Sequence, residues 1–250
     1  MQENSTLAGK GARPAQIASW MHLAGFLAIM AALLVLGLYQ QHAGGGNGTG
    51  SNQGPGQLAS HGYAIPIYLT ALGMDWALLY FCWAGVHHHG GNLWDLAGGR
   101  WASWRDVLSD FAVMLPFWAV WEGAAYGVHW ILGPGNAKSV DSLLPKSLAE
   151  VLVWIATCIT AGICEEMAFR GYLQRQFHAL TGNAAWAILL QALVFGIAHG
   201  YQGWRNVVVI SVLGVLYGVL AAWRKNLRAN MLAHAWSDVW EGWLKFVVWR

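Results

Sequence analysis

Two adjacent glutamates stand near the end of a long apolar segment, where charged side chains are costly. The segment reads ITAGICEEMAFRGYLQRQF and holds Glu165, Glu166 and Arg170. A charge inside a bilayer costs about 2.5–3.5 kcal/mol, so a carboxylate there needs a partner or a function. Residues four apart share a helix face, so Arg170 can pair with Glu166 while Glu165 points about 100° away. Two interpretations stay open: a structural ion pair near a helix end, or part of a catalytic site.

Two further apolar segments contribute histidines. LVFGIAHG ends near His199, and MLAHAWSDVWEGW places His234 and Asp238 four residues apart. If the chain forms an antiparallel helical hairpin turning at residues 181–183, Glu165 and His199 are equally far from the turn. At about 1.5 Å per residue both then lie roughly 25 Å from it. The pattern predicts one buried polar cluster, and such a cluster inside a membrane is a functional site by default.

Two chemistries suit this cluster. A glutamate beside an imidazole can take a proton from water for attack on a peptide carbonyl, provided that donors stabilise the oxyanion. Alternatively, a zinc ion held by Glu165, His199, His234 and Asp238 can acidify that water. The helical zinc-protease signature HExxH is absent from the sequence. A metal assembled from separate helices stays open.

The composition indicates that membrane helices position these groups. The 250 residues are 56% hydrophobic and only 10% charged, whereas soluble domains carry about 25% charged residues. The 17 tryptophans favour the membrane–water interface, at helix ends. The few basic residues are scattered, so nucleic acid is not an expected partner. The cysteines lie singly in apolar runs and predict small buried side chains; they are Cys82, Cys158 and Cys164.

Lipid offers no partner to backbone polar groups, so apolar runs of about 20 residues predict spanning helices. We expect an all-α fold, a polytopic transmembrane bundle of about seven helices in a lipid bilayer, and we expect that bilayer to be a prokaryotic plasma membrane. Pro116 is expected to interrupt the third helix. The expected helices cover 18–39, 63–86, 107–132, a segment from 148 through Glu165, 184–199, 206–223 and 229–249.

The chain divides into three expected parts. Residues 1–62 hold the first helix and a flexible Gly-rich loop at 42–57, residues 63–147 hold helices two and three, and residues 148–250 form a core of four helices. With the N-terminus inside, most basic residues fall on cytoplasmic segments; they are Lys10, Arg13, Arg100, Arg105, Arg170, Arg175, Arg224, Lys225 and Arg228.

Other polar residues receive structural interpretations. Asp75 and Glu122 lie within apolar runs and could face the cavity of the polar cluster as substrate contacts. We interpret both instead as packing partners between helices. The histidines at 87–89 precede a Gly-rich turn and are interpreted as a solvated helix end rather than a metal site.

Three motifs occur in the order of a known family. EEMAFR resembles EExxxR, FGIAH resembles FxxxH, and HAWSD resembles HxxxN/D. These are the motifs of the CPBP intramembrane proteases, which include CAAX prenyl endopeptidases and bacterial relatives often called Abi proteins. The resemblance covers about residues 148–245. It implies an intramembrane endopeptidase of metallo or glutamate type.

The resemblance also implies roles for the residues. Glu165 becomes the general base and His199 its helper in activating water, with Glu166 and Arg170 as the supporting pair. His234 stabilises the oxyanion or binds a metal, for which Zn²⁺ is the open candidate. Asp238 departs from the Asn of many members, and an ionised Asp only accepts hydrogen bonds. It must therefore be protonated, orient His234, or ligate a cation.

The implied substrate is a membrane-associated protein or peptide. Prenylated CAAX tails, bacteriocin precursors and anti-sigma factors are candidates between which the sequence does not choose, and it does not indicate an oligomeric state. Two alternatives belong to other classes. A proton-coupled transporter uses buried Glu, Arg and His as a relay, and a non-catalytic scaffold or immunity factor keeps the fold without turnover.

Overall fold

The computed structural model describes residues 14–44, 63–133 and 143–248, and the regular secondary structure of this part of the chain is all helical, without strands. Its elements are α1 (Trp20–Gly44), α3 (Ala64–His88), α4 (Leu93–Ala97), α5 (Trp104–Leu132), α7 (Leu148–Glu165), the π-helix η2 (Glu166–Leu173), α8 (Gln174–Thr181), α9 (Ala184–Ala198), the 3₁₀ turn η3 (Gly200–Gln202), α10 (Trp204–Arg224) and α11 (Arg228–Val248).

Every predicted apolar run forms a helix, but not every helix is long and apolar enough to cross a membrane. Within the described ranges, five candidate spans are α1, α3, α5, the continuous α7–η2–α8 helix, and α10. Helix α9 has 15 residues, fewer than the about 20 that a span needs. Helix α11, which carries Asp238 and Glu241, is not among the candidates. The all-α membrane fold is confirmed, whereas the count of about seven spans is not.

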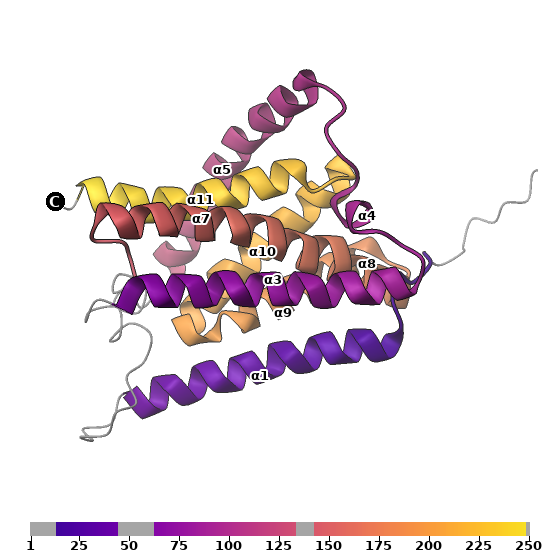
Figure 1. Cartoon of the computed structure of the whole chain (residues 1–250), viewed down its shortest axis with the longest axis horizontal. Coiled ribbons are helices and arrows are strands. Elements are labelled where there is room, and N and C mark those ends of the chain that lie inside the picture. Colours follow the sequence, from indigo (N-terminus) through magenta and orange to yellow (C-terminus); the bar gives the residue numbers. More distant parts are fainter. Residues whose placement is uncertain (1–13, 45–62, 134–142, 249–250) are drawn as a thin grey trace, which may run out of the picture.

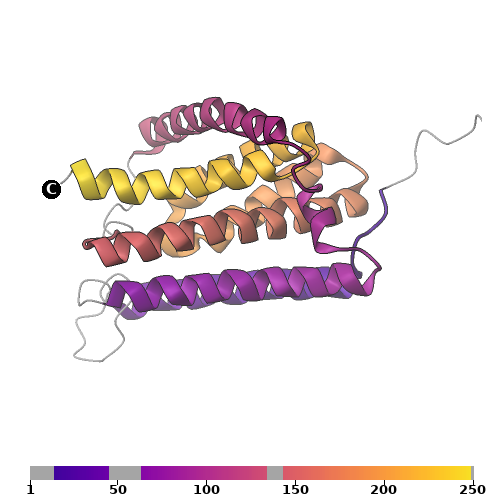
Figure 2. The same ribbon diagram turned by 45° about the horizontal axis from the view of Figure 1, so that its top comes forward.

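Helices α1, α3, α7 and α11 lie along the long axis of one bundle (Figures 1 and 2), and α5 crosses them at a steep angle (Figure 1). Helix α1 begins at the end of the bundle where α3 and α8 end, and α11 ends at the opposite end (Figure 1). Helix α10 packs along α9, and α11 packs along α7. Gly214 and Gly218 permit the first contact, because a Cβ on either would meet Ala192 or Gln191 of α9 at 2.8–2.9 Å.

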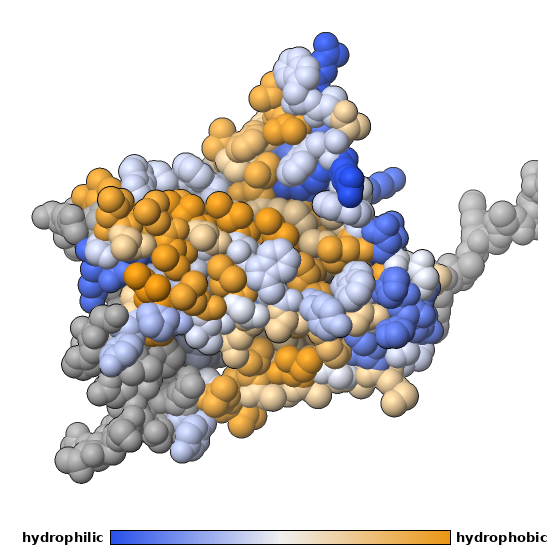
Figure 3. Space-filling view, viewed as in Figure 1, coloured by the Kyte–Doolittle hydropathy of each residue, from blue (hydrophilic) through white to orange (hydrophobic). Residues whose placement is uncertain are grey.

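The surface is that of a membrane protein. Many large apolar side chains are exposed along the spans, such as Trp130 (78%), Tyr126 (74%) and Leu152 (62%). Figure 3 shows hydrophobic residues across the middle of one face and hydrophilic residues gathered toward its ends. Exposed apolar patches of this extent fit lipid rather than water. The chain is a multi-pass integral membrane protein.

The first helix packs against the part of the chain that holds the motifs. His22 of α1 lies 2.7 Å from the Tyr172 hydroxyl and 2.9 Å from the Phe81 carbonyl oxygen. Buried Gln176 bonds the backbone just before α1: Ile17 N donates to its Oε1 at 3.0 Å, and its Nε2 donates to Ala18 O at 2.8 Å. These bonds fix α1 against η2 and α8.

A buried carboxylate joins α5 to the connection between α10 and α11. Asp110 is fully buried and accepts from Arg224 Nη2 at 2.7 Å, Arg228 Nε at 3.0 Å and Trp101 Nε1 at 2.8 Å. Two cations and an indole compensate the desolvation of one carboxylate. This network sets where α11 begins, and the sequence analysis did not identify it.

Several local expectations have clear outcomes. Helix α5 continues through Pro116, so the expected interruption is wrong. Helix α1 extends to Gly44, and the rest of the Gly-rich loop at 42–57 lies outside the described residues. The histidines at 87–89 form an exposed helix end, as predicted, and the short helix α4 was not predicted. All three cysteines are buried and unpaired, in agreement with their interpretation.

Candidate active site

A π-helix presents the glutamates. Helix α7 passes into η2 at Glu166, and all eight residues of η2 are buried. A π turn is wider than an α turn and is frequent at functional sites. Here it occupies the centre of the bundle and contacts α3, α4, α9 and α10. The segment Glu166–Leu173 therefore places the side chains of the first motif among other helices.

Glu166 is the buried centre of a hydrogen-bond network. Its Oε1 accepts from Arg170 Nη1 at 2.8 Å and lies 2.9 Å from His234 Nδ1. Its Oε2 accepts from Asn230 Nδ2 at 3.2 Å, and the same amide donates to Tyr217 O at 2.8 Å. Glu166 and Arg170 have no exposed side-chain surface. The predicted pair of Glu166 and Arg170 forms, and it also holds His234.

The second nitrogen of His234 faces two other carboxylates. Nε2 lies 3.7 Å from Glu165 Oε2 and 3.6 Å from Asp238 Oδ2. These separations exceed direct hydrogen bonds and suit polar groups bridged by water. The Glu165 side chain is 19% exposed and that of Asp238 is 39% exposed, in contrast to buried Glu166. The two adjacent glutamates therefore contact opposite edges of one imidazole, one edge buried and one accessible.

A glycine brings α7 and α11 close enough for these contacts. A Cβ on Gly162 would lie 2.8 Å from both Met231 O and Ala235 N of α11. No side chain fits there without moving one helix. Since Gly162 is one turn before Glu165 and Glu166, the close approach carries both glutamates to the level of His234.

His199 lies at the edge of the cluster. Its Nδ1 is 2.8 Å from Phe195 O, an arrangement in which Nδ1–H donates to the carbonyl and Nε2 is the acceptor nitrogen. The Phe195 ring contacts both histidines, with ring centroids 4.9 Å from His199 and 6.2 Å from His234. Within the described residues, the ion pair of Glu165 is with His234. The role of His199 as its helper stays a prediction.

Aromatic rings cover the ion pair. The Arg170 guanidinium lies 4.3 Å from the centroid of Phe195 and 5.0 Å from that of Tyr217. Tyr217 also stacks on His234, at 5.4 Å with 21° between the planes. Aromatic faces attract cations, and the attraction grows when water is excluded. Phe195 and Tyr217 thus hold Arg170 and His234 in place.

A fourth carboxylate approaches from α3, outside the motifs. Asp75 interacts electrostatically with Glu165, Asp238 and His234. This position agrees with the alternative that Asp75 faces the cavity of the polar cluster rather than with its interpretation as a packing partner. The sequence offers no signal for which face of α3 meets α7. The sequence analysis also did not identify Asn230, although Asn230 precedes His234 by four residues and therefore lies on the same face of α11.

The side chains predicted to bind zinc lie near one another without forming a recognisable metal cluster in the described residues. Among the described residues, no three His, Cys, Asp or Glu side chains are arranged to hold a metal ion. Nδ1 of His199 lies against Phe195 O, and Nδ1 of His234 lies against Glu166, so Nε2 is the nitrogen of each ring that could face a metal. Zinc stays a prediction, and no step of the reaction below passes through it.

The fold and site together define a multi-pass integral membrane protein with a buried carboxylate–imidazole cluster between its helices. Residues 147–240 match the family model described as Type II CAAX prenyl endopeptidase Rce1-like. The match confirms the resemblance to the CPBP intramembrane proteases, and this family supports a protease role. No curated protein and no solved structure matches the chain.

Proposed function

We propose that the chain is an intramembrane endopeptidase that hydrolyses a peptide bond with water activated between Glu165 and His234. The position of His234 carries the proposal. Its Nδ1 is held by Glu166, and its Nε2 faces Glu165 and Asp238 at 3.7 and 3.6 Å. Carboxylates at both edges favour the doubly protonated ring, which donates from Nε2 toward the accessible side.

The reaction follows from these positions. Glu165 takes one proton from water, and the resulting hydroxide attacks the scissile carbonyl carbon. His234 Nε2–H donates to the oxyanion that forms. Collapse of the intermediate breaks the C–N bond, and the protonated Glu165 gives its proton to the leaving nitrogen. Glu166 and Arg170 hold the imidazole, and the Asp238 carboxylate, 3.6 Å from Nε2, favours its charged form.

The proposed substrate is a membrane-associated peptide. Glu165 and Asp238 are partly exposed while the rest of the cluster is buried among helices, so a chain already at the membrane reaches them most readily. The family description, Type II CAAX prenyl endopeptidase Rce1-like, makes a prenylated CAAX peptide the first substrate to test, followed by unprenylated membrane peptides.

The test is cleavage by purified protein in lipid, with ¹⁸O-labelled water and mass spectrometry of the products. We expect one ¹⁸O in the new carboxyl group, loss of cleavage by about 10²–10⁴-fold in Glu165→Gln, and loss in His234→Gln. Glu150→Gln, at the other end of α7, is the matched control and keeps activity. Chelator is expected to leave the rate unchanged. Full activity of Glu165→Gln, or proton flux without cleavage, would refute the proposal and favour a transporter.

A further inference from the structure

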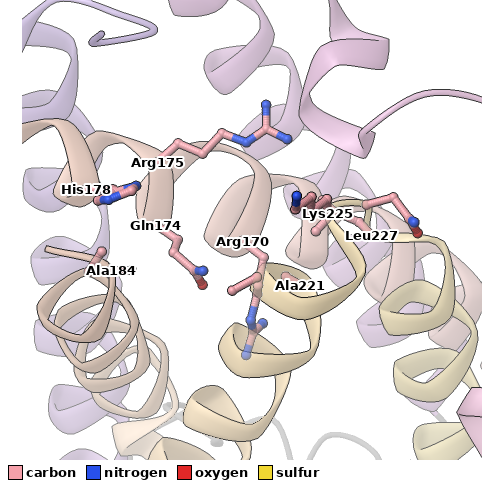
Figure 4. Close-up of a pocket in the computed structure, with 11 residues that line it drawn as sticks. Arg170, Gln174, Arg175, His178, Ala184, Ala221, Lys225 and Leu227 are labelled. Atoms are coloured by element: carbon pink, nitrogen blue, oxygen red, sulfur yellow. The ribbon is translucent and has the colours of Figure 1, made fainter. Parts of the chain in front are cut away.

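A polar cavity lies at the end of the bundle formed by α8, the start of α9 and the end of α10. Its volume is about 360 Å³. Its polar lining consists of Arg170, Gln174, Arg175, His178, Lys225 and Asn226, several of which are seen in Figure 4. Small side chains, including Ala184 and Ala221, leave the space open. Arg170 of η2 and three residues of α8 line the cavity, whereas Glu165, His234 and Asp238 do not.

The lining is cationic. Three of the described residues around the cavity carry a positive charge, and none of the described residues around it is acidic. The Arg175 guanidinium is turned away from Gln174 (Figure 4) and donates to Leu96 O at 3.3 Å. Arg175 therefore adds to the positive potential of the cavity without contacting a ligand directly. Lys225 is the C-cap residue of α10 and adopts the left-handed conformation, with φ 55°. An anion is the ligand that such a lining favours.

Buried polar atoms at the cavity have unused hydrogen-bonding capacity. The Arg170 side chain is fully buried, and its Nε and Nη2 have no hydrogen-bond partner in the described structure. Gln174 donates from Nε2 to Gly218 O at 3.1 Å, while its Oε1 also has no partner there. Figure 4 shows both side chains extending from one helix toward the space beside Ala221. Two guanidinium donors and one acceptor match an anion that also carries a hydroxyl group.

The cavity lies where a lipid headgroup would reach it. The candidate spans Leu148–Thr181 and Trp204–Arg224 both end at its border. Basic pockets between spanning helices bind anionic headgroups, which supply phosphate oxygens to arginine and lysine. A hydrogen phosphate ion offers the same oxygens and one hydroxyl.

We propose that this cavity binds a phosphate group, carried by an anionic lipid with a hydroxylated headgroup or free as hydrogen phosphate. The phosphate oxygens accept from Arg170 and lie near Lys225, and a ligand hydroxyl donates to Gln174 Oε1. Because Arg170 also bonds Glu166, the bound anion shares a cation with the catalytic cluster. This binding site is independent of whether the cluster cleaves peptides.

The experiment uses the full chain in nanodiscs of phosphatidylcholine with or without phosphatidylglycerol, followed by native mass spectrometry of retained lipid. Ala184→Glu places a carboxylate at the cavity, and Lys225→Asn removes a cation with a residue that tolerates the left-handed conformation. Ala185→Glu is the matched control, because Ala185 is exposed on the same first turn of α9 but does not line the cavity. We expect wild type and Ala185→Glu to retain phosphatidylglycerol over phosphatidylcholine, and the other variants to lose about fivefold or more.

A second arm separates the two sources of phosphate. Inorganic phosphate, compared with chloride at equal ionic strength, is added to the protein in detergent while its thermal unfolding is followed. Stabilisation of wild type but not of Ala184→Glu identifies the free ion, whereas lipid retention without this effect identifies the headgroup. If wild type shows neither preference, or if Ala184→Glu and Lys225→Asn behave as wild type in both arms, the proposal is overturned.

Discussion

His234 Nδ1 lies 2.9 Å from Oε1 of Glu166, although the two residues are 68 positions apart. The contact joins the first and third motifs, which lie on η2 and α11. The two adjacent glutamates therefore lie in different environments. Glu166 is buried against Nδ1 of His234, and Glu165 faces Nε2 from a partly exposed position. Similar residues next to each other in the chain are therefore expected to respond differently to the same substitution.

The two glutamates give the first prediction. Glu166→Gln leaves the buried Arg170 guanidinium without its carboxylate, and we expect stability to fall by about 3–5 kcal/mol. Glu165→Gln removes a partly exposed carboxylate, so it should unfold close to the wild-type temperature while losing cleavage. Thermal unfolding of both purified variants in the same detergent checks this. Equal unfolding temperatures would contradict the assigned environments.

The close approach of α7 and α11 gives the second prediction. Gly162→Ala places a Cβ 2.8 Å from the backbone of α11, and we expect a loss of about 1–3 kcal/mol together with reduced cleavage, because His234 moves away from Glu165. Gly123→Ala in α5 is the control, since its Cβ would meet nothing within 4 Å. That control should be neutral or slightly stabilising. Unfolding and cleavage are measured on both variants.

Asp238 gives the third prediction. An amide at this position keeps the shape of the carboxylate and can donate to an oxyanion. We therefore expect Asp238→Asn to keep cleavage within about tenfold, whereas Asp238→Leu, which offers no polar atom, loses about 10²-fold or more. The measurement is the steady-state cleavage rate of wild type and of both variants on the same peptide. Equal losses in both variants would show that the negative charge itself is required.

The buried network at Asp110 gives the fourth prediction. Asp110→Asn leaves Arg224 and Arg228 without their carboxylate, and we expect a loss of about 3–5 kcal/mol in stability. Ser109→Ala, the adjacent control, removes only a 3.3 Å contact with Arg224 at an exposed site and should change stability little. Chemical unfolding followed by tryptophan fluorescence measures both. A small effect of Asp110→Asn would show that the arginines are sufficiently solvated.

Apolar runs and spacing predicted much of the fold. The hairpin turn lies at the predicted residues, because α8 ends at Thr181 and Asn183 caps α9 by accepting from Ala185 N and Trp186 N. The pairing of Glu166 with Arg170 was predicted from their spacing alone. Both features are local, and local chemistry determines them.

The sequence did not predict which residues of different helices contact one another. The hairpin spacing placed His199 level with Glu165, whereas the ion pair of Glu165 in the described residues is with His234, because α7 and α11 approach closely at Gly162. The segment EMAFRGYL gave no sign of a π-helix, since packing on all sides imposes it. Asp75 and Asp110 were not assigned to their networks for the same reason: their partners lie on other helices.

The π-helix has a consequence for how the first helix is held. A π turn holds about one residue more than an α turn, so a regular α-helix over the same residues Glu166–Leu173 would rotate all that follows by about 100°. Gln176 would then no longer face the backbone of Ile17 and Ala18, which it now bonds. The one extra residue of the π turn therefore determines whether Gln176 can hold the N-terminal end of α1, where Ile17 and Ala18 lie 159 and 158 positions earlier in the sequence.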